Sequence, residues 1–380
     1  MLTLELEMLS TSTEVASVAL SLALLARETA SDAEEKSQVA DNFIAAFRQS
    51  GLPGVTLPVS AGGVVIDVPS ILDAIRIVGS GDGSAGWVTM IYLVTAAAGH
   101  YLSPACLGEV FGRGGDALVC GVLAPRGTAR RVPGGYRLSG RWPFASGCRH
   151  AAWISLGAMS EGGGVASFLL PIGDITIQET WDVMGLRASA SHDVEALDCF
   201  VPEHRVFDLN AAANTNEPVG RFPIYGLLAA GIAAVCLGIA EAAIGEALDL
   251  AGAKVPTGSR RRLIDRPAVQ EAIGRSKALV ESGRTYLLDR ARDVTESGPP
   301  PALEARARLR LAATLAVDSA REAVDLMYSA GGGSSLYSRS PLQRHFRDIH
   351  TATQHMMVAQ PTWELAAKVL IGLEVDTSNL

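Results

Sequence analysis

The sequence is poor in cysteine and in charge, and each shortage excludes classes of protein. Its five cysteines are widely spaced and never form a Cys-x-x-Cys pair, so neither a disulfide framework nor a zinc site is indicated. Charged residues make up only 19% of the chain and the net charge is −8, which argues against nucleic acid or anionic lipid as the main partner. We therefore expect a small-molecule ligand and a reducing, cytoplasmic location.

Two common cofactor motifs are also missing. No pair of His or Cys residues has the helical spacing of a His-Glu-x-x-His zinc site, so no metal is predicted. The glycine-containing segment 81–84 follows a helical pattern and lacks the third glycine of a dinucleotide-binding fingerprint. We therefore expect no tight NAD(P)H site in this chain.

One apolar segment, Phe222 to Ala240, carries no charge and is about long enough to span a bilayer. It is rich in Ala and Gly, and Pro223 lies at its start. Glu241 and Glu246 continue the same helical pattern beyond it. These features favour a central bundle helix packed on all sides over a membrane span, and no membrane partner is expected.

The first part of the chain predicts helices. Apolar residues recur at helical spacing from Leu9 to about Gln49, again after Pro69, and from Ser84 to about Ala98. We therefore expect residues 1–115 to form an N-terminal α-helical domain.

Short β-prone runs begin near Asp116 and alternate with Gly and Pro until about Val206. The tripeptide 133–135, Pro-Gly-Gly, lies between two alternating runs and predicts a hairpin. Because these strands form one block between helices, they imply a mostly antiparallel barrel or sandwich. The expected β-domain covers residues 116–210.

The helical pattern returns after a loop and continues to the end of the sequence. The four long candidates are Tyr225 to Lys254, Pro267 to Thr295, Ala302 to Ser329 and Leu342 to Leu373. Four long helices joined by short connections predict a four-helix bundle over residues 211–380, and the fold class is α+β.

This order of helices, strands and bundle resembles the acyl-CoA dehydrogenase-like superfamily over essentially the whole chain. Four segments carry the resemblance in the family's order: Asp82 to Trp87, Gly140 to Gly147, Trp181 to Arg187, and Gly331 to Asp348. The first is similar to the start of the family's third helix. The second is similar to the segment beside the flavin ring.

Within the superfamily the chain is more similar to two-component, group D flavin-dependent monooxygenases than to dehydrogenases. A dehydrogenase needs a carboxylate base on the last helix or near the start of the first bundle helix. In an ungapped alignment Met356 and Tyr225 occupy those places, and neither can serve as that base. The dehydrogenases' Arg-x-x-Phe-Gly motif is replaced by segment 259–264, Ser-Arg-Arg-Arg-Leu-Ile.

The resemblance implies an oxygenase component that hydroxylates or oxidises a small aromatic, polyketide-like or amine substrate through a C4a-hydroperoxyflavin. Reduced FMN or FAD would come from a separate NAD(P)H:flavin reductase, and the chain would assemble as a homotetramer through its bundle. Two alternatives stay open. One is an acyl-CoA dehydrogenase or oxidase with a relocated base, and the other is a redox-inactive binding or scaffold subunit.

The resemblance also suggests catalytic residues. Ser146 would hydrogen-bond to flavin N5 and protect the hydroperoxide, although a serine before a glycine also commonly satisfies a turn. His355, placed on the last helix, would contact the substrate and accept its proton, since a free imidazole has a pKa of about 6.5. The alternatives are a structural histidine, or His350 or His345 in a shifted register.

Further residues are candidates for binding. Trp142 could pack against the flavin ring or simply fill the core. Trp87 and Tyr92 lie on the third helix, where relatives face the substrate, and are expected to contact it. The run Gly331, Gly332, Gly333 and Ser334 would reach the phosphates of a flavin held mostly by a neighbouring subunit, or act as a flexible connector.

Overall fold

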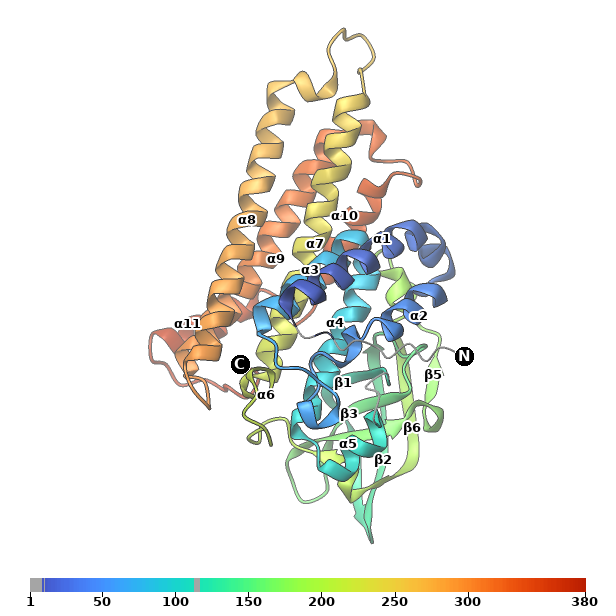
Figure 1. Ribbon diagram of the computed structural model, residues 1–380, viewed down its shortest axis with the longest axis vertical. Coiled ribbons are helices and arrows are strands. Elements are labelled where there is room, and N and C mark those ends of the chain that lie inside the picture. Colours follow the sequence, from blue (N-terminus) through green and yellow to red (C-terminus); the bar gives the residue numbers. More distant parts are fainter. Residues whose placement is uncertain (1–8, 10, 113–116) are drawn as a thin grey trace.

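The structure, a computed structural model, describes residues 9, 11–112 and 117–380. A bundle of long helices forms one end of an elongated molecule and a β-sheet domain forms the other (Figure 1). The N-terminal helices lie between these two parts and contact both. The predicted α+β order of helices, strands and helices is confirmed.

The N-terminal helices are α1 (Ser12–Lys36), α2 (Asp41–Gln49), α3 (Val68–Gly81), α4 (Gly83–Ala97) and α5 (Pro104–Phe111). The single helix expected from Leu9 to Gln49 is thus two helices, because Ser37 adopts a left-handed conformation with φ 52° that ends α1.

Helix α4 runs through the middle of the molecule and packs against α3, α7 and β1. The side chain of Asp82 accepts a hydrogen bond from Ala85 N and caps its start. All of its residues except Ile91 and Thr95 are buried. Gly86 permits the close approach of α3, since an added Cβ would lie 2.5 Å from Gly79 Cα. This packing fixes the start of α4 relative to the rest of the molecule.

The β-domain is one seven-stranded sheet with the order β5-β6-β2-β1-β3-β4-β7. Its strands are β1 (Val119–Val132), β2 (Gly135–Ala145), β3 (Trp153–Ser160), β4 (Val165–Pro171), β5 (Thr176–Gln178), β6 (His192–Pro202) and β7 (Val206–Phe207). Every pairing in the described sheet is antiparallel except that of β1 with β3. The hairpin predicted at Pro133-Gly134 joins β1 to β2, with Gly134 at φ 82°.

The C-terminal part contains α6 (Pro218–Arg221), α7 (Ile224–Ala253), α8 (Pro267–Glu296), α9 (Leu303–Gly331), α10 (Pro341–Ala352) and α11 (Pro361–Leu370). Among the described helices, α7 is the one long and apolar enough to cross a membrane, and 94% of its most apolar window is buried. It packs against α3, α4, α8, α9 and α10. The prediction of a core helix is therefore confirmed.

The last helix differs from the prediction. A single helix from Leu342 to Leu373 was expected, but α10 ends at Ala352 and α11 begins only at Pro361. Pro361 has no N–H with which to continue the helical hydrogen bonds. Met357 and Val358, in the break, are buried in the core instead. His355 therefore lies in the turn after α10 and not on a helix.

Candidate active site

The site is built around the side chain of Trp87, in the first half of α4. Its Nε1 donates a hydrogen bond of 3.0 Å to Ser146 Oγ. Ser146 directly follows β2, where the backbone N–H of Ser146 donates to Phe144 O at 2.9 Å. Phe144 itself adopts a left-handed conformation with φ 67°. Such strain in a residue other than glycine is concentrated at functional sites.

Three hydroxyl groups form a buried chain that ends at Ser146. Ser146 Oγ lies 2.6 Å from Ser191 Oγ, which lies 2.7 Å from Ser189 Oγ. Trp87 occupies one lone pair of Ser146. Either serine can donate in the bond between Ser146 and Ser191, so Ser146 keeps one further hydrogen-bonding position for a ligand. Ser189 and Ser191 were not predicted from the sequence. Their alternation before β6, in Ser-Ala-Ser, was the available signal.

His355 completes the cluster. Its ring centroid lies 5.8 Å from that of Trp87, at an interplanar angle of 59°. Burial, and then the positive charge of Arg310, lower the pKa of His355 to about 4, so the imidazole is neutral at neutral pH. The structure therefore brings Trp87, Ser146 and His355 together, although their assigned roles stay predictions.

The two alternative histidines occupy other environments. His350 Nε2 lies 2.8 Å from Asp325 Oδ1 of α9, so this ring is held against the bundle. His345 is buried, and burial lowers its pKa to about 3. Neither has the contact with Trp87 that His355 makes.

Tyr92 is fully buried, and its hydroxyl donates a hydrogen bond of 2.7 Å to Gly147 O. The phenol therefore supports the turn that carries Ser146. The expected substrate contact is corrected here, because almost none of the side chain is accessible to a ligand.

The expected flavin contact of Trp142 is corrected as well. Trp142 is 0% exposed inside the β-domain, where its Nε1 donates a hydrogen bond of 2.7 Å to Gly157 O. Its ring fills the space beside Gly127, since a Cβ on that glycine would lie 2.2 Å from Trp142 Cζ2. Trp142 is a core residue with no face to offer a cofactor.

Exposed apolar side chains adjoin the cluster in sequence. Phe144 is 66% exposed and its ring contacts Trp181 edge-on at 6.1 Å. Met356, next to His355, is 68% exposed. Single exposed apolar side chains are common on protein surfaces, so these two do not identify a ligand site by themselves. Their places in sequence, next to a buried serine hydroxyl and a neutral imidazole, are compatible with a flat, largely apolar ring such as a flavin.

Two carboxylates near the start of α4 each accept a backbone hydrogen bond through Oδ1, while Asp348 Oδ2 is buried without a partner among the described residues. Asp82 Oδ1 accepts from Ala85 N, and Asp348 Oδ1 accepts a hydrogen bond of 2.6 Å from Leu186 N. Both acids are buried. In the part of the chain that the structure describes, no carboxylate forms a hydrogen bond or ion pair with Trp87, Ser146 or His355. The cluster thus provides no carboxylate base for a dehydrogenase.

The glycine run after α9 lies elsewhere. Lys254 Nζ donates to Gly331 O at 3.1 Å and to Ser334 Oγ at 2.7 Å. This end of α9 points away from the sheet (Figure 1). Gly331, Gly332, Gly333 and Ser334 are therefore not brought to Ser146 within one chain, and their contact with a neighbour's flavin stays a prediction.

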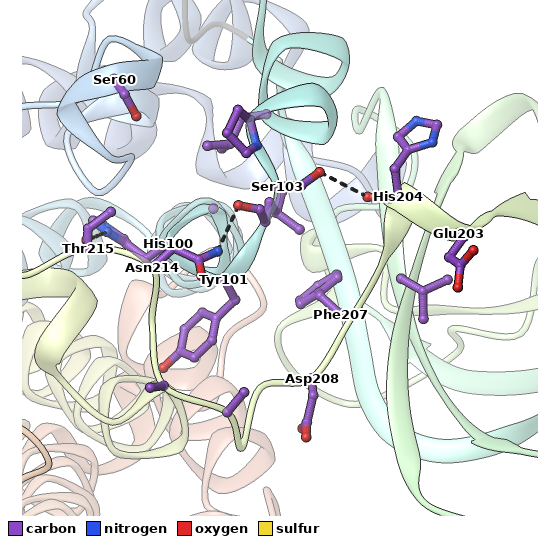
Figure 2. Close-up of a pocket in the computed structure, with 17 residues that line it drawn as sticks. Ser60, His100, Tyr101, Ser103, Glu203, His204, Phe207, Asp208, Asn214 and Thr215 are labelled. Atoms are coloured by element: carbon purple, nitrogen blue, oxygen red, sulfur yellow. Dashed lines mark hydrogen bonds between the residues drawn. The ribbon is translucent and has the colours of Figure 1, made fainter. Parts of the chain in front are cut away.

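Two cavities lie at the opposite end of α4 from its capping residue. The first, of about 570 Å³, is lined by residues that include His100, Tyr101, His204 and Asp208 (Figure 2). The second, of about 600 Å³, shares Tyr101 with it. Neither is lined by Trp87, Ser146 or His355.

His100, the buried histidine of the first cavity, has both nitrogens occupied. Nδ1 lies 2.6 Å from Thr215 Oγ1, and Nε2 lies 3.1 Å from Thr56 O. Burial also lowers its pKa. We therefore assign the chemistry to the cluster of serines, tryptophan and His355 and not to these cavities.

Comparisons with known proteins agree with this geometry. Residues 230–360 match the family model for the C-terminal domain of acyl-CoA dehydrogenase. The chain is 28% identical to indole-3-acetate monooxygenase of Pseudomonas putida over 89% of both sequences. It is 29% identical to the oxygenase component of FADH2-dependent resorcinol hydroxylase from a Rhizobium species, over 92% of both.

Solved structures show the same similarity. The 3-HSA hydroxylase of a Rhodococcus species superimposes with a TM-score of 0.90 at 27% identity, over 97% of this chain and 99% of that one. XiaF of a Streptomyces species, solved with FADH2 and glycerol, superimposes with a TM-score of 0.89 at 28% identity, over 96% of both chains.

The fold is that of the acyl-CoA dehydrogenase-like superfamily. Within that fold the chain is similar to flavin-dependent monooxygenases that act as oxygenase components and use reduced flavin.

Proposed function

We propose that this chain receives reduced FMN or FAD from a separate NAD(P)H:flavin reductase and inserts one oxygen atom into a small aromatic substrate. The names of relatives such as resorcinol hydroxylase and indole-3-acetate monooxygenase support an aromatic substrate. The missing dinucleotide fingerprint supports a separate reductase. A polyketide-like or amine substrate is the broader alternative.

The observation that carries the proposal is the hydrogen-bonded chain from Trp87 through Ser146 to Ser191 and Ser189, next to a neutral His355. When bound, reduced flavin supplies the two electrons with which one oxygen atom of O2 enters the product and the other leaves as water. Trp87 donates to Ser146, and Ser146 would donate to Ser191, which leaves one lone pair of Ser146 to accept the N5–H of reduced flavin.

Burial of these hydroxyl groups also keeps water away from the reacting atoms. Ser146, Ser189 and Ser191 are all buried, and Tyr92 closes the turn behind Ser146. Water exclusion matters because a wet site would release hydrogen peroxide in place of oxygenated product. The residues around Ser146 thus favour productive coupling of O2 consumption to oxygenation.

The dehydrogenase alternative makes opposite predictions. Purified protein should be nearly colourless under our proposal, since oxidised flavin would bind weakly, whereas a dehydrogenase would purify yellow and bleach with an acyl-CoA thioester. Bleaching by a thioester would contradict the proposal. A scaffold subunit would bind no reduced flavin, and Ser146→Ala would leave its function intact.

We also propose that four copies assemble through the C-terminal bundle in the cytoplasm. Leu336 and Tyr337, which follow the glycine run, are both exposed, as expected of side chains that a neighbouring subunit covers. In such an assembly Gly331 to Ser334 would contact a flavin held mainly by the neighbour. All five cysteines are free thiols, which supports a reducing compartment.

A further inference from the structure

The imidazole of His355 has one nitrogen occupied and one open. The backbone N–H of Met357 donates to His355 Nδ1 at 3.2 Å. Nε2 forms no hydrogen bond with any residue that the structure describes. It is not among the buried atoms of those residues that lack a partner, so this nitrogen is accessible. Because the N–H of Met357 can only donate, Nδ1 must be the acceptor. In a neutral ring the proton therefore lies on Nε2.

Arg310 of α9 is near enough to this histidine for its charge to affect the ring, and it is only 2% exposed. Its Nη2 donates a hydrogen bond of 2.9 Å to Met357 O, and its Nη1 donates to Asn379 O. Its Nε is buried without a partner. Within residues 9, 11–112 and 117–380, no Asp or Glu side chain pairs with Arg310. A buried cation without a carboxylate is costly, and such groups are typical of functional sites.

Arg310 and His355 hold the same residue, Met357. Arg310 binds the Met357 carbonyl, while His355 accepts the Met357 N–H. The guanidinium thereby orients the residue whose N–H selects the tautomer of the imidazole. Its positive charge also opposes a second proton on the ring, and, after burial, is the second cause of the lowered pKa of His355.

We infer that His355 faces the substrate as a hydrogen-bond donor through Nε2–H, and that Arg310 is the positioning residue that fixes this tautomer. The substrate part of this inference rests on the proposed function. It replaces the hypothesis that His355 accepts the substrate's proton, because the lone pair on Nδ1 is occupied and Nε2 already carries hydrogen.

The donor at His355 Nε2 restricts the chemistry of the substrate. A donor N–H close to a buried cation stabilises a phenolate or a carbonyl oxygen. The pKa of a bound phenol falls, because this donor favours the charged form of the phenol. The phenol then loses its proton to bulk solvent as it binds, before the site excludes water, and not to His355. A protonated alkyl amine offers no acceptor and is repelled by Arg310. The site therefore selects substrates with an acceptor oxygen.

Solid-state 15N NMR of [15N]histidine-labelled, flavin-free protein tests the tautomer directly, with His355→Gln used to assign the resonance. At pH 7 we expect a neutral ring protonated at Nε2.

In Arg310→Gln, which keeps N–H donors but loses the charge, the tautomer should persist while the pKa of His355 rises towards the usual value of about 6.5. In Arg310→Met, which loses both, the two tautomers should mix. An imidazolium or an Nδ1–H tautomer at pH 7, or an unchanged spectrum in both variants, would overturn the inference.

Turnover of resorcinol and of indole-3-acetate with reduced flavin provides the second arm. His355→Gln keeps a donor near the position of Nε2 but cannot take up a proton, whereas His355→Leu removes both properties. Gln should retain activity within roughly tenfold, and Leu should be lower than Gln by about 10- to 100-fold. Equal, complete losses would indicate a proton acceptor and overturn the inference. No turnover by the unmodified protein would count against the proposed aromatic substrate alone, since the NMR result needs neither flavin nor substrate.

Discussion

At the scale of single residues, the hydroxyl of Ser146 is central, and Trp87 and Ser191 hold it in place. Trp87 and Ser146 are 59 positions apart in sequence but share a hydrogen bond. Motif resemblance predicted that Ser146 and Trp87 belong to the site. It could not predict the hydroxyl chain through Ser191, because hydrogen-bond partners depend on how the loop before β6 folds against β2.

Replacing Ser146 with Ala should separate oxygen consumption from product formation. We expect product yield per reduced flavin to fall at least about tenfold, since a lost hydrogen bond to a charged or polar centre is worth roughly 1.5–3 kcal/mol, with the missing oxygen recovered as hydrogen peroxide. The measurement is peroxide and product per flavin oxidised. Ser155→Ala is the matched control, because Ser155 is a buried β-domain serine whose hydroxyl has no partner. Equal coupling in both variants would refute the assigned role.

Trp142 shows where resemblance misleads. The motif around it favoured a cofactor contact, but its position in β2 turns the ring into the β-domain, where it fills space beside Gly127. Trp142→Phe should lower the free energy of unfolding by about 1–3 kcal/mol, because the Gly157 carbonyl loses its donor. Affinity for reduced flavin should stay unchanged. Weaker flavin binding at unchanged stability, measured by titration and denaturant unfolding, would contradict the correction.

At the scale of elements, three segments meet at Asp348 of α10. Its Oδ1 accepts from Leu186 N, and an added Cβ on Gly83 would lie 3.1 Å from its Oδ2. Asp348 therefore ties α10 to the loop before β6 and to the start of α4. Two of these segments carry Ser191 and Trp87, and the turn that contains His355 directly follows the third, α10.

Asp348 also predicts a pH dependence of stability. Burial, and then the neighbouring Asp82, raise the pKa of Asp348 to about 7. A carboxyl whose pKa is raised on folding stabilises the protein at low pH and loses that contribution as pH rises towards its folded pKa, here between about pH 4 and 7. Asp348→Asn keeps an oxygen for Leu186 N but cannot ionise. At pH 8 the variant should be more stable than the unmodified protein by about 4 kcal/mol, because the pKa of Asp348 is raised by roughly three pH units, with the difference vanishing near pH 4.

Denaturant unfolding of both proteins across this pH range checks the prediction. Asp348→Leu, which loses the bond to Leu186 N, should be destabilised at every pH and serves as the contrast. A constant difference between the Asn variant and the unmodified protein from pH 4 to 8 would show that Asp348 stays ionised throughout.

Helical periodicity predicted the long helices well, since α7, α8 and α9 begin and end close to the expected residues. It failed at the last helix, where the pattern of apolar residues continues through segment 353–360 but the chain turns. There the burial of Met357 and the hydrogen bond from Arg310 override local helix preference. Arg310 is 47 positions from Met357, so no local pattern could have identified its role.

At the scale of the whole molecule, the glycine run and the hydroxyl chain lie in different parts of one chain. Gly331 to Ser334 follow α9 at the end of the bundle away from the sheet, whereas Ser146 follows β2 (Figure 1). If both contact flavin, they contact it in different subunits. In that case a complete flavin site needs the proposed assembly.

Sedimentation of the purified protein should give a mass of about four chains of 39.7 kDa. Lys254→Met removes the two hydrogen bonds that hold Gly331 and Ser334. It should weaken binding of reduced flavin by about tenfold while the assembly persists, since each hydrogen bond contributes on the order of 1 kcal/mol. A monomer that binds reduced flavin with undiminished affinity would contradict the shared site.

We propose that buried hydroxyls where β2 meets α4 protect oxygen chemistry from water. The rate of hydrogen peroxide release measures this protection. Anaerobic protein loaded with reduced FMN or FAD is mixed with oxygenated buffer in the absence of substrate, and peroxide is followed against free reduced flavin. We expect peroxide release from the protein to be slower than from free flavin by at least about tenfold. Ser146→Ala should accelerate this release, because the hydrogen bond that it removes is worth roughly 1.5–3 kcal/mol. Release as fast as from free flavin, unchanged by Ser146→Ala, would contradict the account.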